Sequence, residues 1–289
     1  MDRMELEHIL EDVARVRVAV IGDYCLDAYW FLDDSGSEIS LETGLATRAV
    51  RRQRYSLGGA GNVVMNLVAL GVRKVYAFGV IGSDPFGQEM LRLLKEAGVE
   101  VEGMLVQEDR WNTHVYTKPY HNDVEQNRID FGNFNQLDDP TALRLVACLE
   151  SSLAAVDVVV INEQVAGGIH RCGTFRSSLA DLVARRPEKT FLLDSRNRSE
   201  DYPGTVRKIN ANEAARLCGI RRAPDELVLY SEARQAAEML AQRWGKPVYV
   251  SRGPRGCLVC DGHGVSEVAG LQILGRTDPV GAGDSMLAG

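Results

Sequence analysis

The stretch Val16-Arg17-Val18-Ala19-Val20-Ile21-Gly22-Asp23 gives the first indication of the fold. Its apolar run has the length of a buried strand, and strands buried on both faces are typical of parallel sheets covered by helices. Carboxylates that follow such a strand lie at the edge where open α/β sheets bind ligands. The stretch therefore predicts an α/β protein with two candidate ligand-binding aspartates, Asp23 and Asp27. Two aspartates in an ordinary surface loop would give the same pattern.

The alternation of short apolar runs and helical patterns continues along most of the chain. Residues 62–70 have apolar side chains at helical spacing and are followed by Gly71, a common residue just past a helix end. Further helices are predicted at 85–97, 140–153, 177–186, 212–218 and 232–244, and strands at 75–81, 156–161, 190–193, 248–251 and 257–260. This order predicts a three-layer α/β/α fold with a mostly parallel central sheet.

Two stretches, residues 28–57 and 110–135, break this alternation. They lack a helical period and contain segments in which polar and apolar residues alternate, which is typical of strands with one exposed face. We expect them to form antiparallel strands of a small lid that projects from the main sheet. Neither stretch has the composition of a linker, so we expect residues 1–289 to form a single domain that carries this lid.

The composition restricts the class of partner. The 289 residues carry a formal net charge of −7, from 33 basic and 40 acidic side chains. This balance argues against a general nucleic-acid or membrane surface, so an anionic ligand must be bound by local donors. No apolar run reaches the roughly 20 residues that cross a bilayer, and residues 1–13 lack the apolar core of a signal peptide. We therefore expect a cytoplasmic protein.

The cysteines and histidines give no clear metal pattern. The six cysteines are scattered and are expected to be reduced thiols. Cys257-x-x-Cys260 has no second pair or histidine cluster nearby and lies in an apolar run typical of a strand, so we favour a structural role over a metal or redox site. The five histidines show no zinc spacing, and we expect His114 and His121 to pack in the lid or face solvent.

Gly281-Ala282-Gly283-Asp284 leads into the pattern of a helix. Glycines let the backbone approach a ligand closely, and amides at a helix N-terminus carry partial positive charge, so this turn can stabilise phosphate charge during transfer. A carboxylate beside the turn can take the proton from an attacking hydroxyl. The alternative is a glycine-rich turn in which Asp284 is an ordinary first-turn residue of the helix.

Gly58-Gly59-Ala60-Gly61-Asn62 is a second glycine-rich turn into a helix. It fits neither the dinucleotide-binding pattern nor the P-loop pattern. Its glycines allow a close backbone approach, and the Asn62 amide offers both a donor and an acceptor to ligand hydroxyls. The alternative is a turn that serves only the packing of the helix.

Together with four other segments, these two turns resemble the PfkB, or ribokinase-like, family of carbohydrate kinases along essentially the whole chain. The six segments occur in the family's order: 22–27, 58–62, 79–87, 210–213, 251–256 and 278–284. The resemblance implies a central sheet flanked by helices, with a β-stranded lid over the sugar. It also implies ATP-dependent transfer of the γ-phosphate to a hydroxyl of a sugar or sugar phosphate.

The resemblance implies a role for each matching position in phosphoryl transfer and sugar binding. Asp284 matches the family's catalytic base, and the amides of Gly281, Ala282 and Gly283 match its anion hole. The positions that hold sugar hydroxyls are matched by Asp27, Gly58, Gly59 and Asn62.

The nucleotide end is matched by two further segments. Asn210 and Glu213 match the motif that organises Mg²⁺ and its waters, with Glu213 reaching the metal through water. The loop that borders the nucleotide phosphates is matched by Ser251, Gly253 and Gly256. The resemblance thus implies ATP and Mg²⁺ as cofactors. Because a monovalent cation near the segment 278–284 activates some members, K⁺ is a further candidate.

Within the family, the chain is similar to the heptose-phosphate kinase domain of the ADP-heptose pathway. The similarity rests on segments 26–30 and 127–131 and on Asp194-Ser195-Arg196, where that group has Asp-Pro-Lys. Segments 42–47 and 162–168 depart from that group's pattern. From these segments we expect Arg128 and Glu163 to bind the substrate and Arg196 to bind the nucleotide.

A phosphorylated acceptor would need cations beyond the ATP site. Guanidinium groups suit phosphate because they bond it at two points. The candidates in the lid are Arg51, Arg52, Arg54, Lys118 and Arg128. We expect an anionic sugar as the acceptor; a solvated lid face or a dimer interface would explain the same charges. Because exposed edge strands pair readily, we also expect a homodimer through the lid.

Two other functions fit the same sequence. One is a kinase for a nucleoside or a small alcohol, which a substrate panel would separate. The other is a sugar-binding or regulatory relative without catalysis, against which the presence of Asp284 and its glycines argues. Family members usually continue for several tens of residues past this turn, whereas this sequence ends at Gly289. We therefore expect the usual C-terminal segment, and with it part of the adenine pocket, to be lacking.

Overall fold

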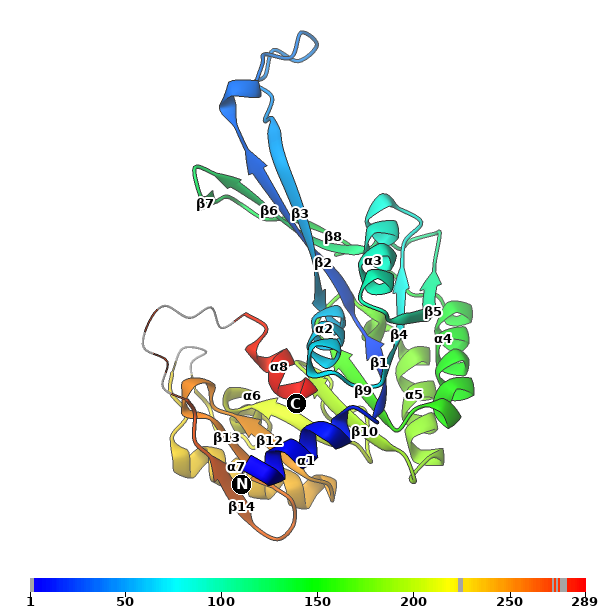
Figure 1. Cartoon of the computed structure of the whole chain (residues 1–289), viewed down its shortest axis with the longest axis vertical. Coiled ribbons are helices and arrows are strands. Elements are labelled where there is room, and N and C mark those ends of the chain that lie inside the picture. The colour runs from blue at the N-terminus through cyan, green and yellow to red at the C-terminus, as the bar shows by residue number, and fades with distance from the viewer. Residues whose placement is uncertain (1–2, 223–225, 272, 274, 276–279) are drawn as a thin grey trace.

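The computed structural model of the chain describes residues 3–222, 226–271, 273, 275 and 280–289. Within them, nine strands form the main sheet in the order β14-β13-β12-β11-β10-β9-β1-β4-β5 (Figure 1). Strands β12 to β5 of this order are parallel, and β13 and β14 add an antiparallel edge. Their bounds are β1 (Arg17–Gly22), β4 (Lys74–Ile81), β5 (Glu100–Val106), β9 (Val158–Glu163), β10 (Thr190–Ser195), β11 (Val206–Asn210), β12 (Val248–Ser251), β13 (Cys257–Cys260) and β14 (Val265–Val268).

Helices connect most of the parallel strands, as the alternating pattern predicted. They are α1 (Arg3–Val13), α2 (Ala60–Leu70), α3 (Pro85–Glu96), α4 (Asp139–Ser152), α5 (Gly173–Arg185), α6 (Ala211–Leu217), α7 (Tyr230–Trp244) and α8 (Ala282–Ala288). Short 3₁₀ turns are η1 (Asp34–Gly36), η2 (Leu153–Ala155), η3 (Ile169–Arg171) and η4 (Gly253–Arg255). The mostly parallel sheet with helices on its faces confirms the predicted fold class.

Local capping signals explain why several predicted helix ends agree with the structure. The Asp84 side chain accepts a hydrogen bond from the Gly87 amide at 2.9 Å, and Pro85 follows it at the first helical position of α3. The Asp138 side chain caps α4 in the same way. Helix α2 ends at Gly71, whose φ of 82° lies in the left-handed region that favours glycine.

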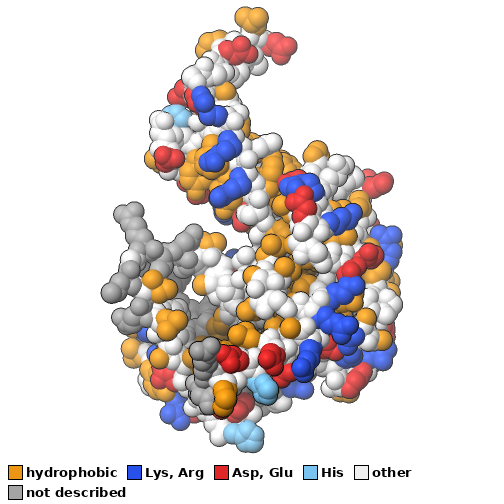
Figure 2. All heavy atoms as spheres, in the orientation of Figure 1, with side chains coloured by type: hydrophobic (Ala, Val, Ile, Leu, Met, Phe, Trp, Pro, Cys, Tyr) orange, Lys and Arg blue, Asp and Glu red, His pale blue; other side chains and the backbone are white. Residues whose placement is uncertain are grey.

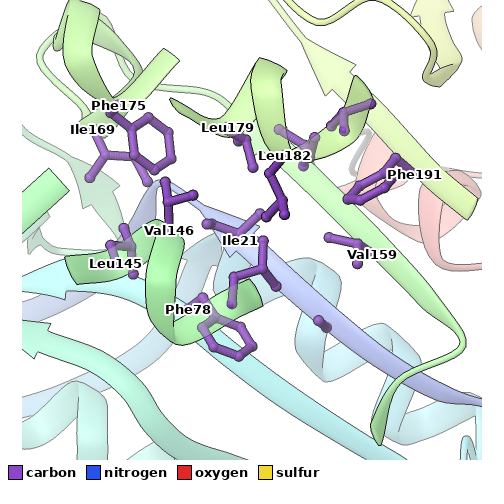
Figure 3. Packing of buried hydrophobic residues seen from close by; sticks show 14 of the residues in the cluster. Ile21, Phe78, Leu145, Val146, Val159, Ile169, Phe175, Leu179, Leu182 and Phe191 are labelled. Carbon is purple, nitrogen blue, oxygen red and sulfur yellow. The ribbon is translucent and has the colours of Figure 1, made fainter. Parts of the chain in front are cut away.

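Separate hydrophobic clusters cover the two faces of the sheet. On one face Ile21, Phe78 and Val159 pack against α4 and α5 (Figure 3). On the other face Val18 and Val20 belong to a cluster that includes residues of α2, α3 and α8. Because successive strand residues point to opposite faces, β1 is buried on both sides, which is why its sequence is almost continuously apolar. A third cluster joins β11, β12 and β13 to α6 and α7.

The lid is a second sheet that projects from the body of the molecule (Figure 1). Its described strands are ordered β3-β2-β6-β7, with β8 also paired to β6. The bounds are β2 (Tyr24–Leu32), β3 (Val50–Gly59), β6 (His114–His121), β7 (Val124–Glu125) and β8 (Ile129–Phe131). Only Asp23 separates β1 from β2, so an interior strand of the main sheet leads directly into the lid.

One expectation about the lid was wrong. Strands β2 and β6 pair in parallel, from Cys25 opposite His114 to Leu32 opposite His121, and not antiparallel. The reason is that β2 follows β1 and β6 follows β5, and these parallel strands of the main sheet end at the same edge. Two segments that leave one edge in the same direction pair in parallel. The pairs β2–β3 and β6–β8 are antiparallel, as expected.

Three strands have no counterpart in the sequence-based assignment. Strands β5 and β14 lie at the two edges of the main sheet. Both contain charged residues, which interrupt the continuous apolar run expected of a buried strand. Strand β11 lies inside the sheet but contains Arg207 and Lys208, both buried. The Arg207 guanidinium donates to the backbone oxygens of Ser199, Tyr202 and Thr205, which satisfies its charge inside the protein.

Cys257 and Cys260 both lie in β13 and are free thiols. Their odd spacing in a strand directs them to opposite faces of the sheet, so they cannot ligate one metal ion together. Among the residues described, no helix has the length and apolar character that crossing a membrane requires.

Candidate active site

A cavity of about 560 Å³ lies between the carboxyl edge of the main sheet and the lid. Strand β1 is flanked by β4 on one side and β9 on the other, so this edge is the point where the strand order reverses and where open α/β sheets bind ligands. We call it the lid cavity. It brings together the predicted site residues Asp27, Gly58, Gly59, Asn62, Arg128, Arg196, Gly281 and Asp284.

Asp284 lies in the first turn of α8 and lines the lid cavity. Its Oδ2 accepts a hydrogen bond of 2.7 Å from Nδ2 of Asn62. Gly281 precedes the helix with a φ of 80°, and a Cβ at this position would lie 2.6 Å from the same Asn62 nitrogen. The backbone conformation therefore favours glycine here, and a larger residue would displace the Asn62 amide. Asp278 and Pro279, the first residues of this segment, lie outside the described residues.

The second glycine turn joins β3 to α2. Gly59 has a φ of 57°, and a Cβ there would lie 2.3 Å from the backbone oxygen of Asp23. That oxygen accepts a hydrogen bond of 2.9 Å from the Ala60 amide. The close approach of the turn to the end of β1 places the start of α2, and with it Asn62, at the lid cavity.

Two cations and one carboxylate from the lid also face the cavity. Lys118 Nζ lies 3.0 Å from Asp27 Oδ1, and both side chains are mostly buried. Burial lowers the pKa of Lys118, but the hydrogen bond and the charge of Asp27, together with Tyr29, outweigh this and leave the pKa above its ordinary value. Arg128 donates from Nε to Asp130 Oδ1 at 2.6 Å, and its guanidinium lies 4.4 Å from the centre of the Tyr116 ring.

Arg196 lines the same cavity from the end of β10. Its Nε donates to Oε1 of Gln164 at 2.7 Å, and Gln164 follows β9 and also lines the cavity. Sequence analysis assigned Arg196 to the nucleotide, whereas the structure brings it to the cavity that also contains Asp284. If Arg196 lay between the acceptor and the nucleotide, its predicted role and its place in the cavity would both be explained.

Glu163 does not line the lid cavity in the described structure; it lies beneath it. Its carboxylate accepts hydrogen bonds of 2.8 Å from the Ser195 hydroxyl and from the Asn197 amide. These contacts fix the backbone on both sides of Arg196. The position that sequence analysis assigned to substrate binding thus supports a cavity-lining residue.

Asp23 is buried below the cavity and accepts three backbone hydrogen bonds. Its Oδ2 accepts from the amides of Gln164 and Val165, each at 3.1 Å, and its Oδ1 accepts from Ile169 at 2.9 Å. Burial raises the pKa of Asp23 to about 7, and the three amide donors oppose this shift. The carboxylate shapes residues 164–169, two of which line the cavity.

A larger cavity of about 1020 Å³ lies beside the amino end of α6. Four of the residues assigned to the nucleotide line it, namely Asn210, Glu213, Ser251 and Gly253. Asn210 Oδ1 accepts from the Glu213 amide at 2.9 Å, and Glu213 Oε2 accepts from the Asn210 amide at 3.0 Å, so the pair forms a capping box. Burial raises the pKa of Glu213, and the bond from the Asn210 amide opposes the rise.

Gly256 is absent from the residues that line this larger cavity and instead closes the loop after η4. Its φ of 84° favours glycine, and a Cβ would lie 2.0 Å from the Val268 oxygen. Among the described residues, no group of three or more histidine, cysteine or acidic side chains has the arrangement of a metal site. Any Mg²⁺ at Glu213 would accordingly depend on water and on ligand oxygens for most of its coordination.

The ion pair between Lys208 and Asp194 was not predicted from the sequence. Lys208 Nζ lies 2.9 Å from Asp194 Oδ2, and 2.9 Å from the position that a Cβ on Gly283 would occupy. The lysine therefore lies directly beneath the glycine turn that carries Asp284. Burial raises the pKa of Asp194, and Lys208 opposes this shift. The available signal was a lysine two residues before Asn210, in a segment otherwise typical of the sheet interior.

The other candidate cations of the lid lie outside the lid cavity in the described structure. Arg51 pairs with Asp33, while Arg52 and Arg54 stack on the rings of Phe31 and Tyr29. Basic side chains lie beside hydrophobic ones on this part of the lid (Figure 2).

The two histidines of the lid differ in environment. His114 is buried, which lowers its pKa to about 4. His121 lies 2.8 Å from Asp34 near the surface. These positions match the expectation of lid packing or solvent for both side chains.

Comparison with known proteins shows which family the chain resembles. The sequence model described as pfkB family carbohydrate kinase matches residues 17–289. The D-beta-D-heptose 7-phosphate kinase of Bordetella bronchiseptica is 31% identical over 283 residues, which cover 96% of this chain and 84% of that protein. The bifunctional protein HldE of Rhodospirillum rubrum is 30% identical and is matched over 98% of this chain and 55% of its own length. The chain thus spans only about half of such bifunctional relatives.

Solved structures support the same fold. Phosphofructokinase-2 from Escherichia coli in complex with fructose-6-phosphate superposes with a TM-score of 0.66 at 19% identity, over 95% of this chain and 84% of that one. Ribokinase from Cryptococcus neoformans in complex with ADP has a TM-score of 0.66 at 17% identity, over 94% of this chain and 85% of that one. At these identities the likeness concerns the fold alone.

Proposed function

The chain belongs to the pfkB family of carbohydrate kinases, and from this premise we propose that its acceptor is a sugar phosphate similar to heptose 7-phosphate. Membership of the family makes the chain an ATP-dependent phosphotransferase with a sugar hydroxyl as acceptor, as the sequence motifs predicted. The nature of the acceptor is the new part of the proposal.

The charge of the lid cavity carries the proposal. Among the described residues, three cations and two carboxylates line it: Lys118, Arg128, Arg196, Asp27 and Asp284. Asp27 pairs with Lys118, and Asp130 pairs with Arg128. The Arg196 side chain bonds to the neutral amide of Gln164 and so keeps its full charge available to a ligand. A neutral sugar needs no such excess of cations, whereas a phosphate group is bound well by guanidinium and ammonium groups.

The arrangement supports a simple transfer step. The acceptor hydroxyl attacks the γ-phosphorus, the bond from that phosphorus to the ADP oxygen breaks, and the hydroxyl proton passes to Asp284. Asn62 donates to Oδ2 of this carboxylate, and within the described part of the chain Oδ1 makes no hydrogen bond, so we assign the proton to Oδ1. General-base assistance of this kind contributes about 10²- to 10⁴-fold in rate. The amides of Gly281, Ala282 and Gly283, with Lys208 beneath them, supply donors and positive charge for the transferred phosphoryl group.

ATP and Mg²⁺ would lie toward the larger cavity. Oxygen atoms of Asn210 and Glu213 are of the type that Mg²⁺ prefers, and a site with few protein ligands suits an ion that keeps several waters. Bound Mg²⁺ would neutralise phosphate charge during the transfer. Ser251 and Gly253 would border the phosphates. A monovalent cation such as K⁺ near residues 278–284 remains part of the proposal.

Replacement of the proposed base tests the transfer step. In Asp284→Asn we expect kcat to fall by at least about 10²-fold, because the amide cannot accept the proton. The dissociation constants of ATP and of the acceptor should stay within about threefold, since the amide has the shape of the carboxylate. ADP release measured by a coupled assay, with binding by calorimetry, checks both. Unchanged turnover in this variant would remove Asp284 from the mechanism.

Removal of one cavity cation tests the charge of the acceptor. Arg128→Gln should raise the KM of a sugar phosphate by about 10-fold or more, because a charge-assisted contact to phosphate is lost. The KM of ATP should change by less than about twofold. Arg51→Gln is the matched control, since Arg51 also pairs with an aspartate of the same lid, Asp33, but does not line the lid cavity in the described structure. Equal increases of both KM values in Arg128→Gln, or the same effect in Arg51→Gln, would contradict the proposal.

We also propose that two chains associate through their lids. Strand β3 is an edge strand whose residues 50–54 are exposed, and such an edge can pair with a second copy. Light scattering should give about twice the chain mass of 31.8 kDa. A mass of one chain at micromolar concentration would contradict this association.

A further inference from the structure

Helix α2 contacts the proposed base directly. Asn62 lies in the first turn of α2, and its Nδ2 donates to Oδ2 of Asp284 at 2.7 Å. The two residues are 222 positions apart in the sequence, so this contact is a product of the tertiary fold. A hydrogen bond to a charged acceptor is shorter and stronger than one between neutral groups.

A second contact joins the same two helices one turn further along. Asn66 Oδ1 accepts from the Ser285 hydroxyl at 3.0 Å, and Asn66 Nδ2 donates to the backbone oxygen of Asn62 at 2.8 Å. Residues four apart lie on one face of a helix, so Asn62 and Asn66 both face α8. Leu287 of α8 is buried in the same cluster as Val63 and Val64 of α2, which fixes the packing of the two helices.

The contact also limits the orientation of the carboxylate. The bond of Oδ2 to Asn62 restrains rotation of the side chain, and Oδ1 makes no hydrogen bond to any other residue that the structure describes. The absence of a side chain at Gly281 makes room for the amide, because a Cβ there would lie 2.6 Å from Asn62 Nδ2. The start of α2 is itself held by the bond from the Ala60 amide to the Asp23 oxygen.

We propose that Asn62 is a positioning residue, which orients the Asp284 carboxylate for proton transfer and acts on the rate through it. The inference rests on the proposed role of Asp284 as the base. It differs from the sequence-based assignment of Asn62, which made it a group that holds a sugar hydroxyl. The two roles predict different kinetics, because a sugar-binding amide affects acceptor affinity, whereas a positioning amide affects the rate of the bound complex.

The first test replaces Asn62 in two ways. Asn62→Ala removes the amide, and Asn62→Asp keeps its shape and an acceptor oxygen but removes the donor. Both should lower kcat by about 10- to 100-fold, since a shift of about 1 Å at the reacting groups can cost 10²-fold. The dissociation constant of the acceptor, measured by calorimetry, should stay within about threefold. A raised dissociation constant with an unchanged kcat would overturn the inference and return Asn62 to sugar binding.

A double-mutant cycle tests whether Asn62 acts through Asp284. In the background Asp284→Ala, the further change Asn62→Ala should lower the residual rate by less than about twofold, because the group it positions is gone. Additive losses would overturn the inference. If Asp284→Ala itself keeps its activity, the proposed base is wrong, which is a separate outcome from a failure of Asn62.

Asn66→Ala is the matched variant, since it removes an asparagine amide that contacts α8 but not the carboxylate. Its kcat should fall far less than that of Asn62→Ala. Equal losses in the two variants, with equal losses of melting temperature, would mean that α2 supports α8 only by packing, and would overturn the specific role of Asn62.

Discussion

The buried carboxylate of Asp23 joins the segments that form the floor of the lid cavity. Its two oxygens accept from the amides of Gln164, Val165 and Ile169, and so hold the loop after β9. Its own backbone oxygen accepts from the Ala60 amide at the start of α2. Burying a carboxylate costs free energy of folding unless its oxygens accept hydrogen bonds. The three amide donors therefore hold the Asp23 carboxylate in place, and the carboxylate in turn holds the loop that carries them. Asp23, which follows the end of β1, is thereby hydrogen-bonded to both the loop after β9 and the start of α2.

The positions of the lid and of the proposed base, Asp284, both depend on Asp23. Strand β2 begins directly after Asp23, so the lid extends from β1, an interior strand of the main sheet. Helix α2 begins at the bond to the Asp23 oxygen, and through Asn62 it reaches the carboxylate of Asp284. A second buried carboxylate, that of Glu163, holds the backbone next to Arg196. Two buried acidic residues that do not line the cavity, Asp23 and Glu163, thus hold the groups that do line it.

Periodicity and glycine motifs made most of the fold and much of the site predictable. Helices such as α2 and α3 have an apolar face and a local cap, and both signals can be read from sequence. Strand β11 was missed because it contains two buried cations, Arg207 and Lys208, which break the apolar pattern of a buried strand. Arg207 is bonded by carbonyls of the preceding loop and Lys208 by Asp194. The parallel pairing of β2 with β6 depends on where each leaves the main sheet. Glu163, the last residue of β9, lies below the cavity, whereas Gln164, which follows it, lines the cavity.

The central claim is that the excess of cations in the lid cavity selects a phosphorylated acceptor. The most direct measurement is kcat/KM from ATP consumption with matched pairs of acceptors, each pair being one sugar with and without its phosphate group. Heptose and heptose 7-phosphate form one pair, and fructose and fructose 6-phosphate form another. We predict that the phosphorylated member of at least one pair is used about 100-fold better or more. Equal or better use of the neutral sugars would contradict the account.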